Sequence, residues 1–427
     1  MRAFSSVLLL IGLCTVAPCL NQPSGHAAQT TQHASPPNSP LLDSLLHAQP
    51  GFDTLLRKAS ELNLQIIYTQ IDRDAQNRPT FTRHTWHLDD GRYFNPASLV
   101  KLPVCIAALE KLHRYEAQGV TLETPMATGT AYRCQTPVRN PRHPRDPDRT
   151  ASVGNYIRRM LLVSDNDAYN RLYEFVGQQE LHERLAAWGM PTARITNRFV
   201  PGCDSLANRH TNPITFLPKG RPPVQQAPAF NPRPLPPPLG PVRVGRGYRA
   251  AGNRLVAEPY DFTTANYLPL AHVTELLQSI LFPGTGPELQ ISAADRKFLI
   301  RYLGLAPHES GYSLYTNKAY YDCFKKYALY GRAPKTTYPA GDLRSFNIVG
   351  LSYGYVADVA YFAEPSTGTE FMLSAVLYVN RDGILNDGRY EYETVGWPFL
   401  GTLGRALYAY EKKRTRPNRP DLSAFRL

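Results

Sequence analysis

A serine and a lysine three residues apart, Ser98 and Lys101, open an apolar segment with helical periodicity. Asn95 suits the N-cap of this helix and Pro96 its first position, so the helix should begin here with both side chains on one face. The free N–H groups of a helix N-terminus favour a developing oxyanion and disfavour a charged lysine. A partly desolvated Lys101 could then take the proton of Ser98. This is the arrangement of an acyl-transfer nucleophile, although Ser-x-x-Lys alone more often marks an ordinary helix start.

The composition is that of a globular protein with a basic surface. The 427 residues are enough for one large or two ordinary domains, and 43% hydrophobic with 19% charged residues allow a sizeable core. The net charge is +12, but no stripe of Arg and Lys and no known module predicts nucleic-acid binding. We therefore expect no nucleic-acid partner, and an anionic cell-wall polymer or membrane surface is the more natural neighbour.

Residues 1–27 are typical of an export signal. Arg2 precedes an apolar run at 7–13 that is too short to favour a membrane-spanning helix, and small residues follow. Cys14 or Cys19 is the alternative, as a lipid-anchored first residue, but the residues before them fit such an anchor poorly. We expect a soluble exported protein of the periplasm or cell envelope.

The cysteines outside this signal are Cys105, Cys134, Cys203 and Cys323. An even number in an oxidising compartment permits two disulfides with three possible connectivities, and buried free thiols are the alternative. The sequence has no Cys-x-x-Cys and no His cluster with ligand spacing. We therefore expect no metal site.

The order of the predicted elements indicates the fold class. Helices are predicted at 52–62, 96–112, 153–163, 167–176, 180–188, 271–281, 293–303 and 397–410. Strands are predicted at 64–71, 80–87, 346–351, 355–363 and 371–379. Two strands, a helical block and three further strands argue for an α/β fold of the α+β type. In it, an antiparallel sheet is flanked by terminal helices, and an all-helical lobe is inserted between its strands.

A second motif follows the first, and the two together resemble the motifs of a known family. Ser98 and Lys101 are followed by a Ser-Asp-Asn motif at 164–166, between two predicted helices. These motifs, in this order and context, resemble those of the class A β-lactamases and related penicillin-binding serine acyltransferases. The resemblance implies a β-lactamase/transpeptidase-like fold, with Ser98 as nucleophile and Lys101 as general base. It implies further that Ser164 passes a proton to the leaving nitrogen and that Asn166 binds the substrate amide. A role as a helix cap is the structural alternative for this motif.

The third motif of the family, Lys-Thr-Gly, is altered in this chain. Its best match, at 348–350, has Ile and Val in place of Lys and Thr and keeps only Gly350. The cation and hydroxyl that help to hold a substrate carboxylate in the family are therefore missing, and Arg344 or Arg209 could replace the cation. Gly350 still allows the backbone to approach a substrate closely. The resemblance implies that the N–H of Leu351 pairs with that of the nucleophile as an oxyanion hole.

A second departure concerns deacylation. Class A β-lactamases carry a glutamate after the helical block that activates the hydrolytic water, and the corresponding residue here is Val200, which cannot act as a base. Asp204, or a residue of 208–213, could substitute. His210 is one candidate, although a loop histidine more commonly packs or caps.

These observations predict a β-lactamase-like serine hydrolase or acyltransferase at 51–415, acylated at Ser98 by β-lactams or related amides and deacylated slowly. A cell-wall peptide is a further substrate class, no metal or organic cofactor is implied, and a monomer is expected. We expect a flexible tether at 28–50, a Pro-rich loop insertion at about 213–252 and a basic tail at 416–427. The alternative function is a catalytically weak or inactive binding module of the cell envelope that keeps the fold.

Overall fold

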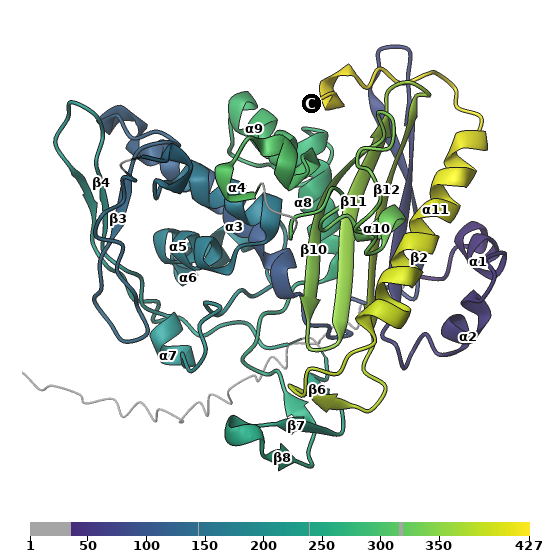
Figure 1. The fold of residues 1–427 in the computed structure, drawn as a ribbon, viewed down its shortest axis with the longest axis horizontal. Helices are drawn as coiled ribbons and strands as arrows, with labels where there is room; N and C mark the ends of the chain where they lie inside the picture. The colour runs from purple at the N-terminus through teal and green to yellow at the C-terminus, as the bar shows by residue number, and fades with distance from the viewer. Residues whose placement is uncertain (1–35, 144, 239, 316–318) are drawn as a thin grey trace, which may run out of the picture. The chain divides into compact units, whose positions relative to one another are not determined.

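A computed structural model describes residues 36–143, 145–238, 240–315 and 319–427. The expected signal at 1–27 and the first part of the expected tether lie outside these residues. The fold is built around a five-stranded antiparallel sheet of strand order β10-β11-β12-β1-β2 (Figure 1). Its strands are β1 (Gln65–Arg73), β2 (Pro79–Trp86), β10 (Arg344–Ser352), β11 (Tyr355–Glu364) and β12 (Thr369–Tyr378).

The first strand of the chain lies beside the last long one. In the β1–β12 pair, Gln65 is opposite Val376 and Gln70 is opposite Phe371. Successive side chains of a strand point to opposite faces, and both faces of this sheet are covered. Accordingly, Ile66 packs in the core on one side of the sheet and Ile67 in the core on the other.

Helices cover both faces of the sheet, as the order of elements predicted (Figure 1). The core on one face includes residues of α1 (Pro40–His47), α2 (Phe52–Arg57), α10 (Tyr327–Tyr330) and α11 (Trp397–Lys413). The core on the other includes residues of α3 (Lys101–Leu112), α8 (Leu270–Leu281) and α9 (Ala293–Gly304). The predicted antiparallel sheet with flanking terminal helices is confirmed. None of the helices in the described part of the chain has the length and apolar character needed to cross a membrane.

The predicted helical lobe consists of α4 (Val153–Val163), α5 (Asn166–Val176) and α6 (Gln178–Ala187), packed beside α3. Each of the first two helices starts at a capped N-terminus: Ser152 Oγ accepts the N–H of Asn155, and Asp165 Oδ1 accepts the N–H of Ala168. These caps satisfy backbone donors that a helix start leaves free. They also set the short connection between α4 and α5, in which Ser164 lies.

The expectation of a flexible tether at 28–50 is wrong for its described second half. Helix α1 buries Leu42 and Leu46 against the sheet, and Trp86 Nε1 donates to Asp43 Oδ1 at 3.0 Å. Polar and proline-rich composition suggested disorder, but three leucines at 41, 42 and 45 and a fourth at 46 supply an apolar helical face.

The expected basic tail at 416–427 packs against the fold. Leu422 and Phe425 are buried, and the Phe425 ring lies 4.8 Å from that of Tyr361 on β11. The segment is basic in composition, but its two apolar residues pack on the core beside α8 and α9.

The Pro-rich insertion at 213–252 is not an irregular loop throughout. Its strands β4 (Ile214–Phe216) and β5 (Val224–Gln226) form a small sheet with β3 (Met126–Thr128). Its strand β6 (Arg243–Val244) pairs with β9 (Tyr260–Asp261), and β7 (Gly247–Arg249) pairs with β8 (Leu255–Val256) and β13 (Ile384–Leu385). Prolines at 213, 218, 222, 223 and 228 flank β4 and β5, and proline cannot donate to a ladder, which limits these two strands to three residues each.

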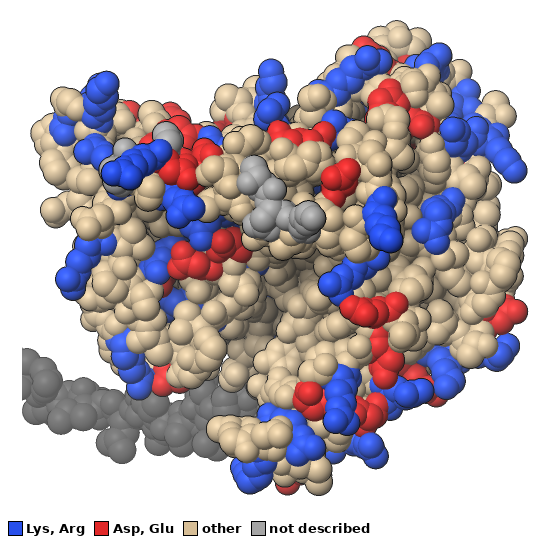
Figure 2. Space-filling model, viewed as in Figure 1, with Lys and Arg blue, Asp and Glu red and all other residues tan. Residues whose placement is uncertain are grey.

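Figure 2 shows the charged side chains on one face of the molecule. Lys and Arg are interspersed with Asp and Glu over this face rather than gathered in a single stripe. The net charge of +12 is therefore not concentrated on the face in view.

Candidate active site

Ser98 lies in a turn of 3-10 helix, Ala97–Val100, and α3 begins only at Lys101. The prediction that the α-helix begins at Asn95 and Pro96 is therefore wrong by one turn. Asn95 does bind the backbone, because its Oδ1 accepts the N–H of Ala97 at 2.9 Å. Ala97 has a φ of 45°, a left-handed conformation that is uncommon for a residue other than glycine. Strain of this kind persists where the surroundings impose it, and here it sets the direction of the Ser98 side chain.

Lys101 and Ser98 meet as the spacing predicted. The Nζ of Lys101 lies 3.0 Å from Ser98 Oγ, 2.9 Å from Ser164 Oγ and 2.7 Å from Asn166 Oδ1, and it also contacts the carbonyl oxygen of Ser164. Two of these four partners are carbonyl oxygens, which only accept. A neutral amine can donate one N–H to each of them and keep its lone pair for a hydroxyl proton. The contacts therefore suit a neutral Lys101 that accepts from Ser98 or Ser164.

The surroundings of Lys101 favour this neutral form. The side chain is fully buried, and desolvation, followed by the charge of Lys325, lowers its pKa to about 7. The ring of Phe199 lies 5.5 Å from Nζ and closes the site on one side. An amine with a pKa near neutrality can take up a proton at physiological pH.

Lys325 is a site residue that sequence reasoning missed. Its Nζ donates to the carbonyl oxygen of Leu161 at 2.7 Å, in the last turn of α4 before Ser164. Burial lowers the pKa of Lys325 to about 8. No motif marks it, because it lies between two short helical segments more than two hundred residues after Lys101.

A carboxylate accompanies this buried cation. Desolvation raises the pKa of Asp358 to about 6, although nearby Lys326 and Lys325 oppose the shift. Oδ2 of Asp358 accepts the N–H of Ala328 and Oδ1 accepts from Asn347, both at 2.8 Å. The second lysine, Lys326, donates to Asn347 Oδ1 at 2.9 Å and to two backbone carbonyls. Buried ionisable side chains are therefore gathered beside Asn347 of β10.

The altered third motif lies beside the nucleophile. Ile348 is fully buried in the core and presents no polar group. A Cβ on Gly350 would come within 2.7 Å of the carbonyl oxygen of Pro96, so only glycine allows β10 to approach the nucleophilic turn this closely. Leu351 follows, and both Leu351 and Ser98 line one pocket. The structure thus brings together the two residues that were predicted to supply oxyanion-binding N–H groups.

Neither arginine proposed as a replacement cation reaches this place. Arg344 Nη1 pairs with Glu309 Oε2 at 2.7 Å. Arg209 donates to the carbonyl oxygens of Asn231 and Arg233, each at 2.7 Å. Neither arginine is among the described residues that line the pocket.

The pocket beside Ser98 has a volume of about 570 Å³. Asn166, Val200 and Leu351 line it, together with aromatic residues of the insertion such as Tyr260. Among the described residues that line it, the only carboxylate belongs to Asp261, which pairs with Arg243 at 3.6 Å. The pocket therefore offers mainly amide, hydroxyl and aromatic groups to a substrate.

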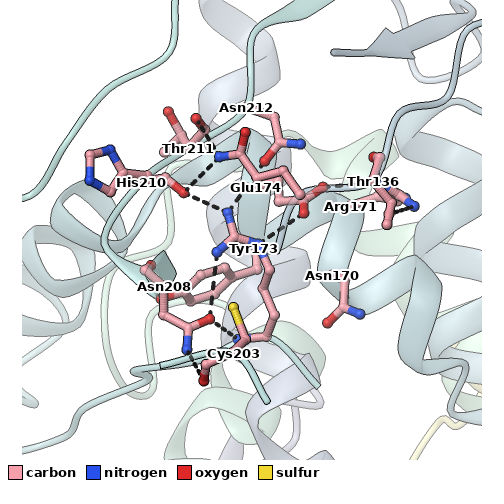
Figure 3. Close-up of polar contacts among 12 residues, drawn as sticks. Thr136, Asn170, Arg171, Tyr173, Glu174, Cys203, Asn208, His210, Thr211 and Asn212 are labelled. Atoms are coloured by element: carbon pink, nitrogen blue, oxygen red, sulfur yellow. Dashed lines mark hydrogen bonds and ion pairs between the residues drawn. The ribbon is translucent and has the colours of Figure 1, made fainter. Parts of the chain in front are cut away.

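The segment that holds Val200 is firmly anchored. Arg198 Nε donates to Glu174 Oε1 at 2.8 Å, and both side chains are buried. Figure 3 shows Glu174 and Asn208 within the polar network of this region. The N–H of Phe199 donates to Asn170 Oδ1 at 2.7 Å. These contacts fix Arg198 and the backbone of Phe199, the two residues directly before Val200. Val200 therefore lines the pocket in a defined position.

The proposed substitutes for the missing glutamate are engaged elsewhere. Asp204 pairs with Arg133 and caps α7 (Ser205–Asn208) by accepting the N–H of Ala207. The His210 ring stacks on that of Tyr132, with 3.8 Å between the centroids. Neither Asp204 nor His210 is among the described residues that line the pocket. Packing, which we considered the commoner role for such a histidine, is what the structure shows.

The four cysteines are free thiols in the structure, Cys105 and Cys323 buried and Cys134 and Cys203 partly exposed. In the described ranges, no group of three or more His, Cys, Asp or Glu side chains is arranged to hold a metal ion.

Comparisons with known proteins agree with the motifs. Residues 53–220 match the model of a family described as the β-lactamase enzyme family, and these residues include Ser98, Lys101, Ser164 and Asn166. The resemblance to β-lactamase-like serine hydrolases is thereby confirmed for this part of the chain. No curated protein sequence matches the chain.

Solved structures with a similar fold include β-lactamases and a penicillin-binding protein. A β-lactamase from Sphaerobacter thermophilus is 15% identical, covers 88% of this chain and 98% of its own, and has a TM-score of 0.43. One from Xanthomonas campestris is 14% identical, with coverages of 86% and 97% and a TM-score of 0.45. The protein PBP-A is also 14% identical, with coverages of 89% and 100% and a TM-score of 0.45.

Proposed function

We propose that this protein is a serine hydrolase or acyltransferase that forms an acyl-enzyme at Ser98 with β-lactams or related amides. The observation that carries the proposal is the position of Lys101 Nζ, 3.0 Å from Ser98 Oγ and 2.9 Å from Ser164 Oγ in a buried site. One amine thus contacts both the hydroxyl that must lose a proton and a hydroxyl that can pass one on. The family match over 53–220 supports this class of chemistry.

The proposed acylation moves one proton along this line. Ser98 Oγ attacks the amide carbonyl carbon while its proton passes to the neutral Nζ of Lys101. The N–H groups of Ser98 and Leu351 would bind the oxyanion, an interaction whose loss typically costs about 100- to 1,000-fold in rate. The proton then passes through Ser164 Oγ to the leaving nitrogen as the carbon–nitrogen bond breaks. The product is an ester at Ser98, and Lys101 is neutral again.

Lys325 has a proposed role in the same step. Its buried charge lowers the pKa of Lys101, and its contact with Leu161 places it at the end of α4 beside Ser164. It would therefore stand in for part of the altered third motif as a positioning residue, because its charge acts on the base from another element of the fold. It is not among the described pocket-lining residues, so we assign it no contact with substrate.

We propose further that deacylation is slow. Val200 lines the pocket and is the residue that the resemblance matches to the water-activating glutamate, whereas Asp204 and His210 are engaged in other contacts. The carboxylate of Asp261 is a poor base, because hydrogen bonds from Thr263 lower its pKa.

The test is intact-protein mass spectrometry after mixing with a fluorescent penicillin, followed over time. We expect an adduct on the unaltered protein and on Ser352→Ala, a matched serine that lines the same pocket, but none on Ser98→Ala. Persistence of the adduct supports slow deacylation. Steady hydrolysis of nitrocefin without an initial burst would contradict it, and a penicillin adduct that survives Ser98→Ala would contradict the assignment of the nucleophile.

One observation favours a second candidate, a non-hydrolytic binding module of the cell envelope. Ile348 and Val349 are buried and offer no group to a substrate carboxylate. This candidate predicts that Ser98→Ala keeps full activity in cells that depend on the protein, whereas the enzyme hypothesis predicts that the activity is lost.

A further inference from the structure

Two loops that are far apart in the sequence lie side by side at the edge of the pocket. Several contacts join residues 132–135 to residues 204–211. Tyr132 stacks on His210 at 3.8 Å, and Arg133 Nη2 pairs with Asp204 Oδ2 at 2.5 Å. Gln135 Nε2 donates to the carbonyl oxygens of Thr211 at 3.0 Å and His210 at 3.4 Å. Both loops are thus held in register over several residues. We call this contact the seam: Cys134 lies within it, and Cys203 directly precedes it in the chain.

Cys134 directly follows Arg133 and Cys203 directly precedes Asp204, so the Arg133–Asp204 ion pair brings the two cysteines to the same point of the contact. Burial, followed by the neighbouring Cys134 thiol, raises the pKa of the Cys203 thiol to about 12. Neither Cys105 nor Cys323 lies where it could pair with Cys134 or Cys203. Cys105 is buried in the core on the α3 face of the sheet, whereas Cys323 is buried in the opposite core and donates to the carbonyl oxygen of Ala333 at 3.1 Å. Four cysteines permit three sets of two disulfides. The structure supports a single disulfide, between Cys134 and Cys203, because Cys105 and Cys323 lie in opposite cores.

Cys203 also lines the pocket that contains Ser98. It follows Val200 by three residues, in the wall whose other end is anchored by Arg198 and Glu174. In Figure 3, Cys203 lies beside Asn208, whose amide donates to its carbonyl oxygen at 3.4 Å. At the other end of this wall, Asp204 pairs with Arg133 and so joins the wall to residues 132–135.

We propose that Cys134 and Cys203 form a disulfide under oxidising conditions, and that this bond fastens the pocket wall at 199–204 to the loop at 132–135. The bond needs no activity at Ser98, so its existence is independent of the proposed function.

The reaction requires an oxidant, which is a second disulfide. A thiolate of one cysteine attacks that disulfide and forms a mixed disulfide, releasing one thiol. The other cysteine of the pair then attacks the mixed disulfide and releases the second thiol. Two protons and two electrons leave the Cys134–Cys203 pair, and the oxidant is reduced to two thiols.

The first experiment determines whether the bond forms. The full chain is equilibrated with mixtures of oxidised and reduced glutathione, quenched with acid, alkylated and digested without reduction for peptide mass spectrometry. We expect a cross-linked peptide pair containing Cys134 and Cys203, with Cys105 and Cys323 alkylated. The pair should persist in Cys323→Ser, the matched control, and disappear in Cys134→Ser and Cys203→Ser. Alkylation of both Cys134 and Cys203 at the most oxidising ratio would overturn the proposal.

The second experiment determines whether the bond fastens the wall. Oxidised and reduced forms of the unaltered protein are compared by limited proteolysis and by thermal unfolding. We expect the oxidised form to lose cleavage within 199–211 and to have the higher Tm, since a cross-link restricts the unfolded chain. Cys203→Ser should show neither difference between oxidised and reduced conditions. Equal cleavage of both forms of the unaltered protein would refute the fastening, whatever its activity toward penicillin.

Discussion

The rate of acylation at Ser98 should depend on pH through the charge of Lys101. Burial and the neighbouring Lys325 lower the pKa of Lys101 to about 7. Only the neutral amine can accept the serine proton. Because the neutral form grows as pH rises through the pKa, the rate should rise with pH and then level off.

The size of the effect follows from the shift of this pKa. With a pKa of about 7, roughly half of the molecules carry a neutral Lys101 at pH 7. With the ordinary lysine pKa of 10.5, the neutral fraction would be about 0.03%. Burial therefore increases the amount of competent base on the order of 1,000-fold. Below pH 7, the rate should fall about tenfold for each pH unit.

The assay is the second-order rate of adduct formation with a fluorescent penicillin, from about pH 5 to about pH 9. Mass spectrometry of quenched samples measures acylation apart from deacylation. Circular dichroism at each pH controls for loss of the fold, and Ser352→Ala should reproduce the profile of the unaltered protein.

Two results would refute this reasoning. A rate that is independent of pH over this range would mean that Lys101 is not the base in the rate-limiting step. A rate that continues to rise tenfold per unit above about pH 9 would mean that burial does not lower the pKa of Lys101 as its surroundings indicate.

Two substitutions test neighbouring parts of the site. Lys325→Met removes a positive charge near Lys101, so the pKa of Lys101 should rise and the acylation profile should move to higher pH. The control, Lys326→Met, removes a buried lysine that contacts Leu303 and Asn347 instead, and it should leave the profile in place. Equal shifts in both variants would refute a specific role of Lys325. Val200→Glu places a carboxylate on the pocket wall and should shorten the lifetime of the penicillin adduct about 100-fold, within the range of a positioned general base; an unchanged lifetime in time-resolved mass spectrometry would show that this position does not govern deacylation.

Much of the local structure follows from periodicity and end signals in the sequence. The helix at Val153–Val163 was predicted with its exact bounds, because its apolar residues have helical spacing and a Ser-Asp-Asn turn follows it. The cap at Ser152 was seen only in the structure. The helix at 40–47 and the packing of 422–425 were not predicted, because polar and proline-rich surroundings hid short apolar faces. These faces are stable only against a core that the local sequence does not contain.

The motifs by themselves predicted Ser98, Lys101, Ser164 and Asn166 as site residues, because the spacing of residues on a helix and at a helix cap is a local property. Only the tertiary structure decided what surrounds them. Lys325 reaches the same site from the other end of the chain, and long-range packing, not spacing, determines which charge lies beside a buried amine. Packing likewise turned His210 away from the pocket and placed Cys134 beside Cys203. Side chains that are positioned by neighbouring residues can be predicted from a sequence. The pKa of a buried group and the pairing of two cysteines depend instead on which distant segments pack around them and exclude water.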